Sequence, residues 1–435
     1  MKKIVWALLV LSVVTALLVS GCAGPAPQPT PTAAPPAAKP EEATPVPPAP
    51  TPKPPEAVKL ILWTKEGEEA LDWNKALVEE FNAANPGITI ELVKKENVEV
   101  LREDFQTASL AGSPPEMLWT VNDHAGPFVA ADIIEPVDGL FDLSVFVDSA
   151  LAAVKLEGKT WGVPISNGNH LMLLYNKKLI AEAPKDTDEL FAKGKELTGG
   201  GNYGLVWNQT EPFWLVPWLG GFKGKVFADD GVTPTLNTPE MIATLQFLHD
   251  MKYDAQIIPP ESDYDGADTL FKEGKAAMII NGDWSLSSYK DVLGDDLGVG
   301  RIPMVSATGE WPKPYTSGVY FMLAKGLSGD KLEAAKAFIN FVASRDKQLE
   351  MVRLLKRLPA LKEALDDPLI ADDPILKGSA DQMVVGTPMP TVLEMRCNWD
   401  AMKPEMQAVL ADTKTPEDAA AAMQSAAEAC IKALE

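Results

Sequence analysis

The sequence has few of the residues from which most catalytic centres are built. Among 435 residues there are only three histidines, His124, His170 and His249, and three cysteines, all well separated. No HExxH, GxSxG or CxxC pattern is present, so the usual signatures of zinc hydrolases, serine hydrolases and dithiol oxidoreductases are missing. We therefore expect no catalytic residues, no cofactor and no metal. Because 61 carboxylates remain, a glycosidase-like acid pair stays open as an alternative.

Basic residues are also scarce. Lysine and arginine number 39 against 61 aspartates and glutamates, which gives a formal charge of −22. Nucleic-acid binding depends on basic side chains that neutralise phosphates, so this balance argues against it. It also disfavours a phosphorylated or carboxylated ligand.

The N-terminal residues have the pattern of an export signal. Lys2 and Lys3 precede an apolar run, residues 4–19, which is shorter than the ~20 residues of a membrane-spanning helix. Val19-Ser20-Gly21-Cys22 resembles the lipobox of bacterial lipoproteins. The resemblance implies a signal peptide over 1–21 and a lipid anchor on Cys22, while the alternative is an uncleaved anchor helix. In both cases the rest of the chain is expected outside the cytoplasm.

Residues 22–56 are expected to form a tether between the lipid-anchored cysteine and the folded part. Residues 23–56 hold 14 of the 37 prolines and little that could pack in a core. Proline-rich chain extends by ~3.1 Å per residue, so the tether could hold the folded part well away from a bilayer.

The remaining residues, 57–435, are too many for one ordinary core and suit two lobes. Their apolar patterns predict strand, helix and strand over 58–64, 70–85 and 88–93, which is a βαβ unit and implies an α/β lobe. The same patterns predict strands at 116–121, 161–165, 171–175, 203–207, 276–280 and 319–323, and helices at 98–111, 239–251, 267–273, 331–343, 346–355, 394–411 and 415–435.

Cys397 and Cys430 lie on the last two predicted helices, at about equal distances from the turn at 412–414. Antiparallel packing of these helices would bring the two sulfurs to the same level. In an oxidising compartment we expect a structural disulfide, the alternative being two free thiols.

Two further patterns are weak. Gly199-Gly200-Gly201 lacks the rest of a phosphate-binding motif and is interpreted as a flexible connection. The stretch Glu261–Gly266 spaces its acidic residues as an EF-hand loop does, but Lys272 occupies the position of the bidentate glutamate. We therefore interpret the stretch as a polar turn before a helix.

Aromatic residues carry the positive signal. Eleven tryptophans are present, and several lie beside turn residues or acids. Sugars present C–H faces that stack on aromatic rings and hydroxyls that bond to carboxylates and amides, so a neutral oligosaccharide site needs this mixture. The aromatic residues in question are Trp63, Trp119, Phe213, Trp214, Trp284 and Trp399.

A series of motifs gives the chain its resemblance to a known family. In order they are LILWT at Leu60, FNAANPGITIE at Phe81, PPEMLWTVNDHAG at Pro114, GKTWGVPI at Gly158, LLYNKKLI at Leu173, EPFW at Glu211, FKEGKAAMIINGDW at Phe271, AAKAFINFVAS at Ala334 and MPTVLEMRCNWDAM at Met389. From Val58 to Leu434 the chain resembles the extracellular solute-binding proteins of sugar ABC importers, in the maltose and maltodextrin-binding branch.

This resemblance implies a two-lobed periplasmic-binding-protein fold of α/β class, with a hinge between the lobes. The N-lobe would comprise 57–166 and 318–366, and the C-lobe 167–317 and 367–435. The implied partners are an oligosaccharide and the transmembrane subunits of an ABC importer, served by a monomer. The implied ligand-binding residues are Trp119, Asp123, Glu211, Phe213, Trp284 and Trp399, to which the aromatic pattern adds Trp63.

The chain departs from the maltose binders at three places. His124 stands where they have arginine, Gly67-Glu68 where they have Asp-Lys, and 167–170 replaces a segment that carries a binding glutamate. The aromatic set is therefore better matched than the polar set. The leading hypothesis is a maltodextrin receptor; the alternatives are a receptor for another oligosaccharide, a lipid-anchored polysaccharide-degrading enzyme and a structural surface protein.

Overall fold

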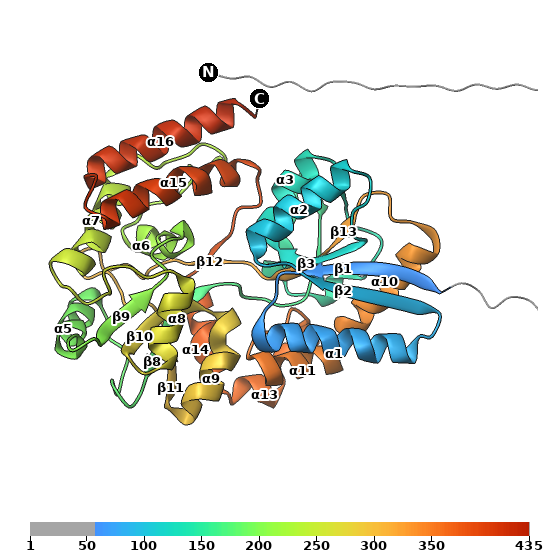
Figure 1. The fold of residues 1–435 in the computed structure, drawn as a ribbon, viewed down its shortest axis with the longest axis horizontal. Coiled ribbons are helices and arrows are strands. Elements are labelled where there is room, and N and C mark those ends of the chain that lie inside the picture. The colour runs from blue at the N-terminus through green and yellow to red at the C-terminus, as the bar shows by residue number, and fades with distance from the viewer. Residues whose placement is uncertain (1–56, 435) are drawn as a thin grey trace, which may run out of the picture. The chain divides into compact units, whose positions relative to one another are not determined.

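The computed structural model describes residues 57–434. The expected signal peptide, Cys22 and the proline-rich segment lie outside the described residues. Within them the chain forms two α/β lobes, each built on its own sheet (Figure 1). The predicted fold class is confirmed.

The first lobe begins with the predicted βαβ unit. Strands β1 (Val58–Thr64) and β2 (Ile88–Lys94) pair in parallel, from Val58 opposite Ile88 to Thr64 opposite Lys94, and α1 (Glu68–Ala84) connects them. The strand order is β2-β1-β3-β13-β4, and β7 also pairs with β13. The other strands of this sheet are β3 (Met117–Val121), β4 (Ile134–Glu135), β7 (Val163–Pro164) and β13 (Val319–Ala324).

The helices of the first lobe start where the sequence supplies caps. The Asn97 side chain accepts a hydrogen bond from the Val100 N–H at the start of α2. The apolar side of α10 packs on the sheet through Phe338 and Ile339, both fully buried. These helices are α2 (Val98–Leu110), α3 (Ala125–Ala130), α4 (Asp148–Ala152), α10 (Gly329–Val342), α11 (Arg345–Leu355) and α12 (Lys362–Leu365).

The second lobe has a four-stranded sheet in the order β11-β8-β10-β9. Its central strand β10 runs parallel to β9 and antiparallel to β8, so this sheet is mixed. Every residue of β10 is buried, because helices cover both faces of the strand. The strands are β8 (Leu171–Asn176), β9 (Tyr203–Trp207), β10 (Ala276–Gly282) and β11 (Leu297–Gly300).

Eight helices of the second lobe surround this sheet, and four of them have proline in the first turn, where no N–H is needed. Helix α8 begins at Tyr264, with the Asp263 side chain accepting from the Gly266 N–H, so part of the EF-hand-like stretch is a helix cap. The helices are α5 (Thr187–Leu197), α6 (Val216–Gly221), α7 (Pro239–Tyr253), α8 (Tyr264–Lys272), α9 (Leu286–Leu293), α14 (Pro374–Met383), α15 (Glu394–Leu410) and α16 (Pro416–Lys432).

The chain passes between the lobes three times: between β7 and β8, between β11 and β13, and between α12 and α14. At these crossings Gly168 bridges to Ser317, and β12 (Tyr315–Thr316) pairs with β14 (Thr387–Pro388). Helix α13 (Pro368–Ala371) lies on the third crossing. The lobe boundaries given above stay a proposal. The remaining elements are β5 (Lys155–Leu156), β6 (Lys159–Thr160) and the 3₁₀ turns at Asn122–His124, Leu143–Val145, Pro212–Trp214, Asp283–Ser285 and Gly294–Asp296.

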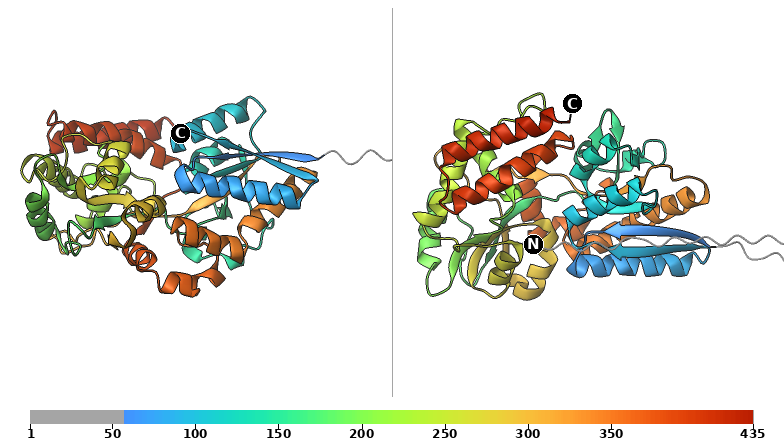
Figure 2. Two further views of the ribbon diagram at one scale, coloured as in Figure 1. Left: turned by 60° about the horizontal axis from the view of Figure 1, so that its bottom comes forward. Right: turned by 45° about the horizontal axis from the view of Figure 1, so that its top comes forward.

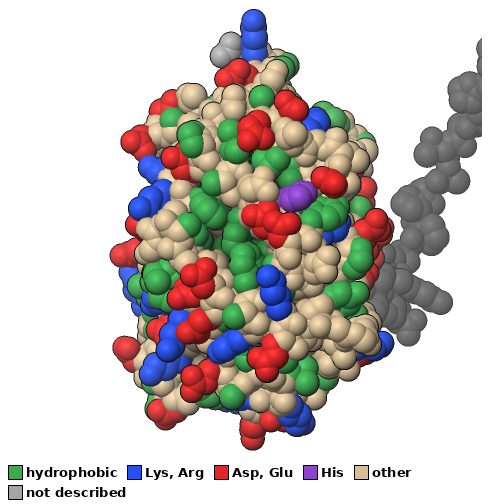
Figure 3. All heavy atoms as spheres, turned by 90° about the vertical axis from the view of Figure 1, so that its left-hand side faces the viewer, with side chains coloured by type: hydrophobic (Ala, Val, Ile, Leu, Met, Phe, Trp, Pro, Cys, Tyr) green, Lys and Arg blue, Asp and Glu red, His purple; other side chains and the backbone are tan. Residues whose placement is uncertain are grey.

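Helices α15 and α16 lie side by side at one end of the second lobe (Figures 1 and 2). On the outer face of that lobe, acidic side chains are interspersed among basic ones, with apolar side chains in a shallow hollow (Figure 3). This face therefore has no continuous basic area of the kind that binds nucleic acid.

Candidate functional site

Three of the predicted aromatic residues lie together on the second lobe. Phe213 follows β9, Trp284 follows β10, and Trp399 lies on α15. The ring centroid of Phe213 is 6.2 Å from that of Trp284 and 6.2 Å from that of Trp399. All three rings are partly buried against the core of this lobe. We call Phe213, Trp284 and Trp399 the aromatic cluster.

The turn that carries Phe213 is fixed by its neighbours. Glu211 has an extended backbone, and Pro212 occupies the first position of the 3₁₀ turn Pro212–Trp214. The buried indole N–H of Trp214 donates to the backbone oxygen of Ile280 on β10 at 2.8 Å. This bond holds the turn against the central strand, and Phe213 is positioned with it.

Trp284 depends on the glycine two residues before it. A Cβ atom on Gly282 would lie 2.2 Å from the Trp284 ring, so only glycine lets the indole lie against the backbone there. The indole N–H donates to the Tyr264 hydroxyl on α8 at 3.1 Å. The ring is thus held from both the strand and the helix, which favours a rigid stacking surface.

Asp123 faces this cluster from the first lobe. It lies in the 3₁₀ turn after β3 and lines one small pocket with residues of α15, including Trp399 and Arg396. One carboxylate oxygen, Oδ1, is buried and makes no hydrogen bond. The pocket has a volume of about 10 Å³, enough for a water molecule and far too small for a sugar ring.

Burial raises the pKa of Asp123 to about 6, and the nearby negative charge of Glu99 adds to the effect. The Trp399 side chain and the Arg396 charge oppose it. Burial raises the pKa because the ionised carboxylate loses its hydration. The same pocket contains His124, whose pKa is lowered to about 3 by burial and by the charges of Arg102 and Arg396. At neutral pH the pocket therefore holds an ionised acid beside a neutral imidazole.

Several ion pairs connect the lobes, and another involves Glu211, the acid before the Phe213 turn. Arg396 on α15 binds Glu99 of α2 at 2.6 Å, and Lys272 on α8 binds Glu68 of α1 at 3.2 Å. Glu211 is 42% exposed and binds Lys403 of α15 at 2.5 Å. Glu211, Glu99 and Glu68 are therefore each paired with a cation. Asp283, next to Trp284, is buried and accepts a hydrogen bond from the Asn169 N–H.

Two predicted ligand-binding residues lie elsewhere, and for Trp119 the prediction is wrong. Its side chain is 1% exposed and packs between Trp73 and Phe321 at centroid distances of 5.7 and 5.0 Å, in the core of the first lobe. Trp63 lies on β1 against a second core cluster, and the Lys95 ammonium covers its ring at 3.5 Å from the centroid. Neither indole joins the aromatic cluster.

The structure also shows what replaces the family's residues at the departures. His124 is buried and bonds through Nδ1 to the Thr120 hydroxyl at 2.8 Å. His170 is buried as well, and its Nε2 lies 3.0 Å from the Ser379 backbone oxygen. Both histidines are therefore held by polar neighbours inside the protein. Glu68 is used in the ion pair with Lys272.

Sequence reasoning missed several residues that build the site. Tyr264 bonds to Trp284, and Arg396 and Lys403 pair with Glu99 and Glu211. Each of the three lies on a helix whose sequence pattern does not show which way the side chain points. A buried pair was missed too: Arg357 donates to both oxygens of Glu66 at 3.0 Å, and both side chains are 4% exposed. Glu66, Arg396 and Lys403 each lie within four residues of a tryptophan, which was a signal for them; Tyr264 and Arg357 had none.

Among residues 57–434 no group of three or more histidine, cysteine, aspartate or glutamate side chains is arranged to hold a metal ion. In the same stretch, no helix combines the length and the apolar character that a membrane crossing requires.

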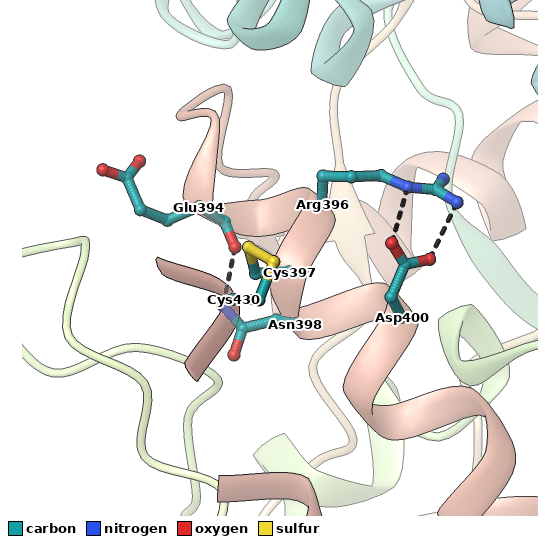
Figure 4. Close-up of a disulfide and its surroundings, with 6 residues drawn as sticks. All are labelled: Glu394, Arg396, Cys397, Asn398, Asp400 and Cys430. Atoms are coloured by element: carbon teal, nitrogen blue, oxygen red, sulfur yellow. Dashed lines mark hydrogen bonds and ion pairs between the residues drawn. A yellow bond between two sulfur atoms is a disulfide. The ribbon is translucent and has the colours of Figure 1, made fainter. Parts of the chain in front are cut away.

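The structure joins Cys397 on α15 to Cys430 on α16 in a disulfide, with Cα atoms 5.6 Å apart (Figure 4). Arg396 and Asp400 form an ion pair on the same stretch of α15, and the Asn398 side chain donates to the Glu394 backbone oxygen. The disulfide thus lies one helical turn or less from Trp399.

Comparisons with known proteins agree with this geometry. Residues 76–378 match the family model described as bacterial extracellular solute-binding protein. The chain is 28% identical over 364 residues to the maltotriose-binding protein of Pyrococcus abyssi, covering 82% of this chain and 78% of that protein. It is 25% identical over 390 residues to the galactooligosaccharide-binding protein of Bacillus subtilis, covering 86% and 90%. The solved maltose/maltodextrin-binding domain from Bdellovibrio bacteriovorus, bound to maltotriose, superposes with a TM-score of 0.83 at 37% identity, covering 86% of this chain and all of that one.

Proposed function

Since the chain belongs to the bacterial extracellular solute-binding proteins, we propose that it is an extracytoplasmic receptor that captures maltodextrin-type oligosaccharides and delivers them to an ABC importer. The observation that carries the proposal is the aromatic cluster. Phe213, Trp284 and Trp399 come from three separate parts of the chain and meet in one place. Aromatic rings grouped in this way suit the C–H faces of successive sugar rings.

Asp123 supplies the polar part of the proposed site. A buried carboxylate oxygen without a hydrogen bond is costly, and a sugar hydroxyl donating to it would recover that cost. Because Asp123 and the cluster belong to different lobes, one ligand would bind both and favour the closed arrangement. Entry of a ligand requires the lobes to separate, since the pocket between them has a volume of only about 10 Å³.

Charge balance supports a neutral ligand. Two of the acids near the cluster are paired with cations, Glu211 with Lys403 and Glu99 with Arg396. A ligand that carried phosphate or carboxylate groups would find no unpaired cation among these residues. The family and its relatives are binding proteins, which favours capture without turnover.

Further details belong to the same proposal. The chain acts as a monomer, with lobe boundaries at 57–166 with 318–366 and 167–317 with 367–435. Cys22, outside the described residues, carries the lipid anchor, and the segment after it is the tether. The transmembrane subunits of the importer are the partner.

A second candidate keeps the receptor and changes the sugar. The galactooligosaccharide-binding relative covers 86% of this chain, a little more than the maltotriose-binding one. A polysaccharide-degrading enzyme is a third and weaker candidate. It would need two acids on either side of a glycosidic bond, and Glu211 is already bound to Lys403.

Thermal unfolding of the purified protein tests these candidates. The sugars are maltose, maltotriose, cyclodextrin, galactooligosaccharide, cellobiose and xylo-oligosaccharides. Ligand at ~100 times its Kd adds about 2.7 kcal/mol to the free energy of unfolding, which is visible as a shift of several degrees. We expect the α-glucans to shift the transition and chromatography to show no cleaved sugar.

Two variants and a control link the shift to the cluster. Trp284→Ala and Trp399→Ala should lose the shift, because each removes a stacking surface. Trp311→Ala is the matched control, since that indole lies against Arg301 and not in the cluster. A shift with galactooligosaccharide alone would select the second candidate, cleavage would select the enzyme, and no shift with any sugar would refute the sugar receptor.

A further inference from the structure

Helix α15 carries three side chains of the proposed site, all in its N-terminal half. Trp399 belongs to the aromatic cluster, Arg396 binds Glu99 of the first lobe at 2.6 Å, and Lys403 binds Glu211 at 2.5 Å. We call residues 394–403 the proximal half of α15. The position of this half decides where Trp399 meets the other rings.

Within α15, one backbone hydrogen bond is missing between the proximal half and the rest of the helix. Pro404 lies inside α15 and has no N–H to donate to the Asp400 oxygen. A proline ring inside a helix also crowds the carbonyl four residues before it. Side chains on both sides of Pro404 lie in the core of the second lobe: Met395 and Met402 before it, and Met406 and Val409 after it. A helix of this kind bends most easily at the proline.

The chain before the proximal half is bound to the other lobe. The Asn122 side chain donates to the Met389 backbone oxygen at 3.1 Å, and the Thr391 hydroxyl donates to the Ala153 oxygen at 2.8 Å. Asn122 and Ala153 belong to the first lobe. Any movement of that lobe therefore pulls on the start of α15.

The disulfide opposes this pull. Cys397 lies in the proximal half, two residues before Trp399, and is 2% exposed (Figure 4). Its partner Cys430 lies near the end of α16, which is fixed in the second lobe by Ala420, Met423 and Ala427, all fully buried. We propose that the Cys397–Cys430 disulfide is a positioning element of the sugar site, which makes the proximal half of α15 move with the second lobe.

Without the disulfide, the core contacts of Met395 and Met402 are left to oppose this movement, and the bend at Pro404 gives the proximal half room to shift towards the first lobe. Trp399 then occupies its place beside Phe213 for only part of the time. If that fraction fell to about a tenth, the apparent Kd would rise about tenfold, since only the competent fraction binds. This inference rests on the proposed function for its ligand.

The experiment measures both the position of α15 and the affinity. Hydrogen exchange in the absence of sugar is compared between the wild-type protein and the variant Cys397→Ala/Cys430→Ala. We expect faster exchange over 394–403 and little change over 405–410. Titration calorimetry with maltotriose, at a temperature where both proteins are folded, should give a Kd about tenfold higher for the variant.

Two further variants separate positioning from general loss of stability. Leu190→Ala removes a fully buried side chain from α5 and should lower the Tm without changing the Kd. Pro404→Ala, added to the cysteine-free variant, restores the missing helix bond and should recover part of the affinity.

Equal Kd values for the wild-type protein and the cysteine-free variant, with only the Tm lowered, would overturn the inference. If the wild-type protein bound no maltotriose, the proposed function would fail. The exchange measurement would still decide the inference in that case, and unchanged exchange over 394–403 would refute it.

Discussion

Asp123→Asn should make the unliganded protein more stable at neutral pH. Burial raises the pKa of Asp123 from its ordinary 3.8 to about 6 in the folded protein. The folded state therefore binds this proton more strongly than the unfolded state, and stability falls as the pH rises from about 4 to about 6. Asparagine keeps the shape and removes the charge, so the variant avoids this loss.

The size of the gain follows from the same values. The change from 3.8 to about 6 corresponds to roughly 3 kcal/mol, at ~1.36 kcal/mol for each tenfold change in proton binding. We expect a gain of up to about 3 kcal/mol above pH 7 and almost none below pH 4. The variant should also lose the stabilisation by sugar, because the acceptor for the hydroxyl is changed.

Urea unfolding at pH 4, 5, 6 and 7.5 measures this difference. His124 has a lowered pKa, so it stabilises the folded state above pH 6.5 and this contribution is lost as the pH falls towards 3. Both proteins contain His124, and its contribution cancels when their free energies of unfolding are subtracted.

Asp142→Asn is the control for the sign of the stability change, because the pKa of Asp142 is shifted in the opposite direction. The Ser144 hydroxyl and backbone N–H lower the pKa of the exposed Asp142, so its replacement should destabilise the protein slightly at neutral pH. A difference between Asp123→Asn and the wild-type protein that stayed constant from pH 4 to 7.5 would refute the reasoning.

Two other predictions concern the supports of the site. Gly282→Ala should displace the Trp284 ring, lower the free energy of unfolding in urea by about 1–3 kcal/mol and weaken the sugar affinity measured by calorimetry. Gly300→Ala is the control and should change neither quantity, because its Cβ would meet its nearest neighbour at 3.5 Å. Equal effects of the two variants would contradict the role of Gly282. Burial alone would raise the pKa of Glu66, but the charges of Arg357 and Lys65 outweigh it and hold that pKa low. Arg357→Met should therefore lower the free energy of unfolding by roughly 3–5 kcal/mol, because it leaves the buried Glu66 charge unpaired. Adding Glu66→Gln should recover most of this stability. A double variant as unstable as the single one would show that the unpaired charge is not the cause.

Much of the fold could be predicted because local signals agreed with the tertiary structure. The βαβ unit at 58–94 and the helix opened by Thr415 were predicted, and the Thr415 hydroxyl does accept from the Asp418 N–H. The helices α5 and α14 were missed, although Asp186 and Asp373 cap them, since their apolar residues are few. Proximity of Cys397 to Cys430 followed from two antiparallel helices of similar length.

The site was harder to predict because it depends on the direction in which each side chain points. All five residues of β3 are buried, so the strand shows no alternation, and nothing in the sequence tells that Trp119 points into the core while Asp123, four residues later, faces the other lobe. For Trp63, the contact with Lys95, the residue after β2, is likewise not signalled by the local pattern. Contacts between distant segments are set by packing and not by local pattern.

The place of β13 in the first sheet has a consequence for how the protein folds. This strand pairs with β3, β4 and β7, and Val319 lies opposite Val121, about 200 residues earlier in the chain. The first lobe therefore cannot complete its sheet until most of the second lobe has been synthesised. Pairing over such a distance closes a long loop, which makes folding slow. A chain stopped before residue 319 would leave three strand edges open to association with other chains.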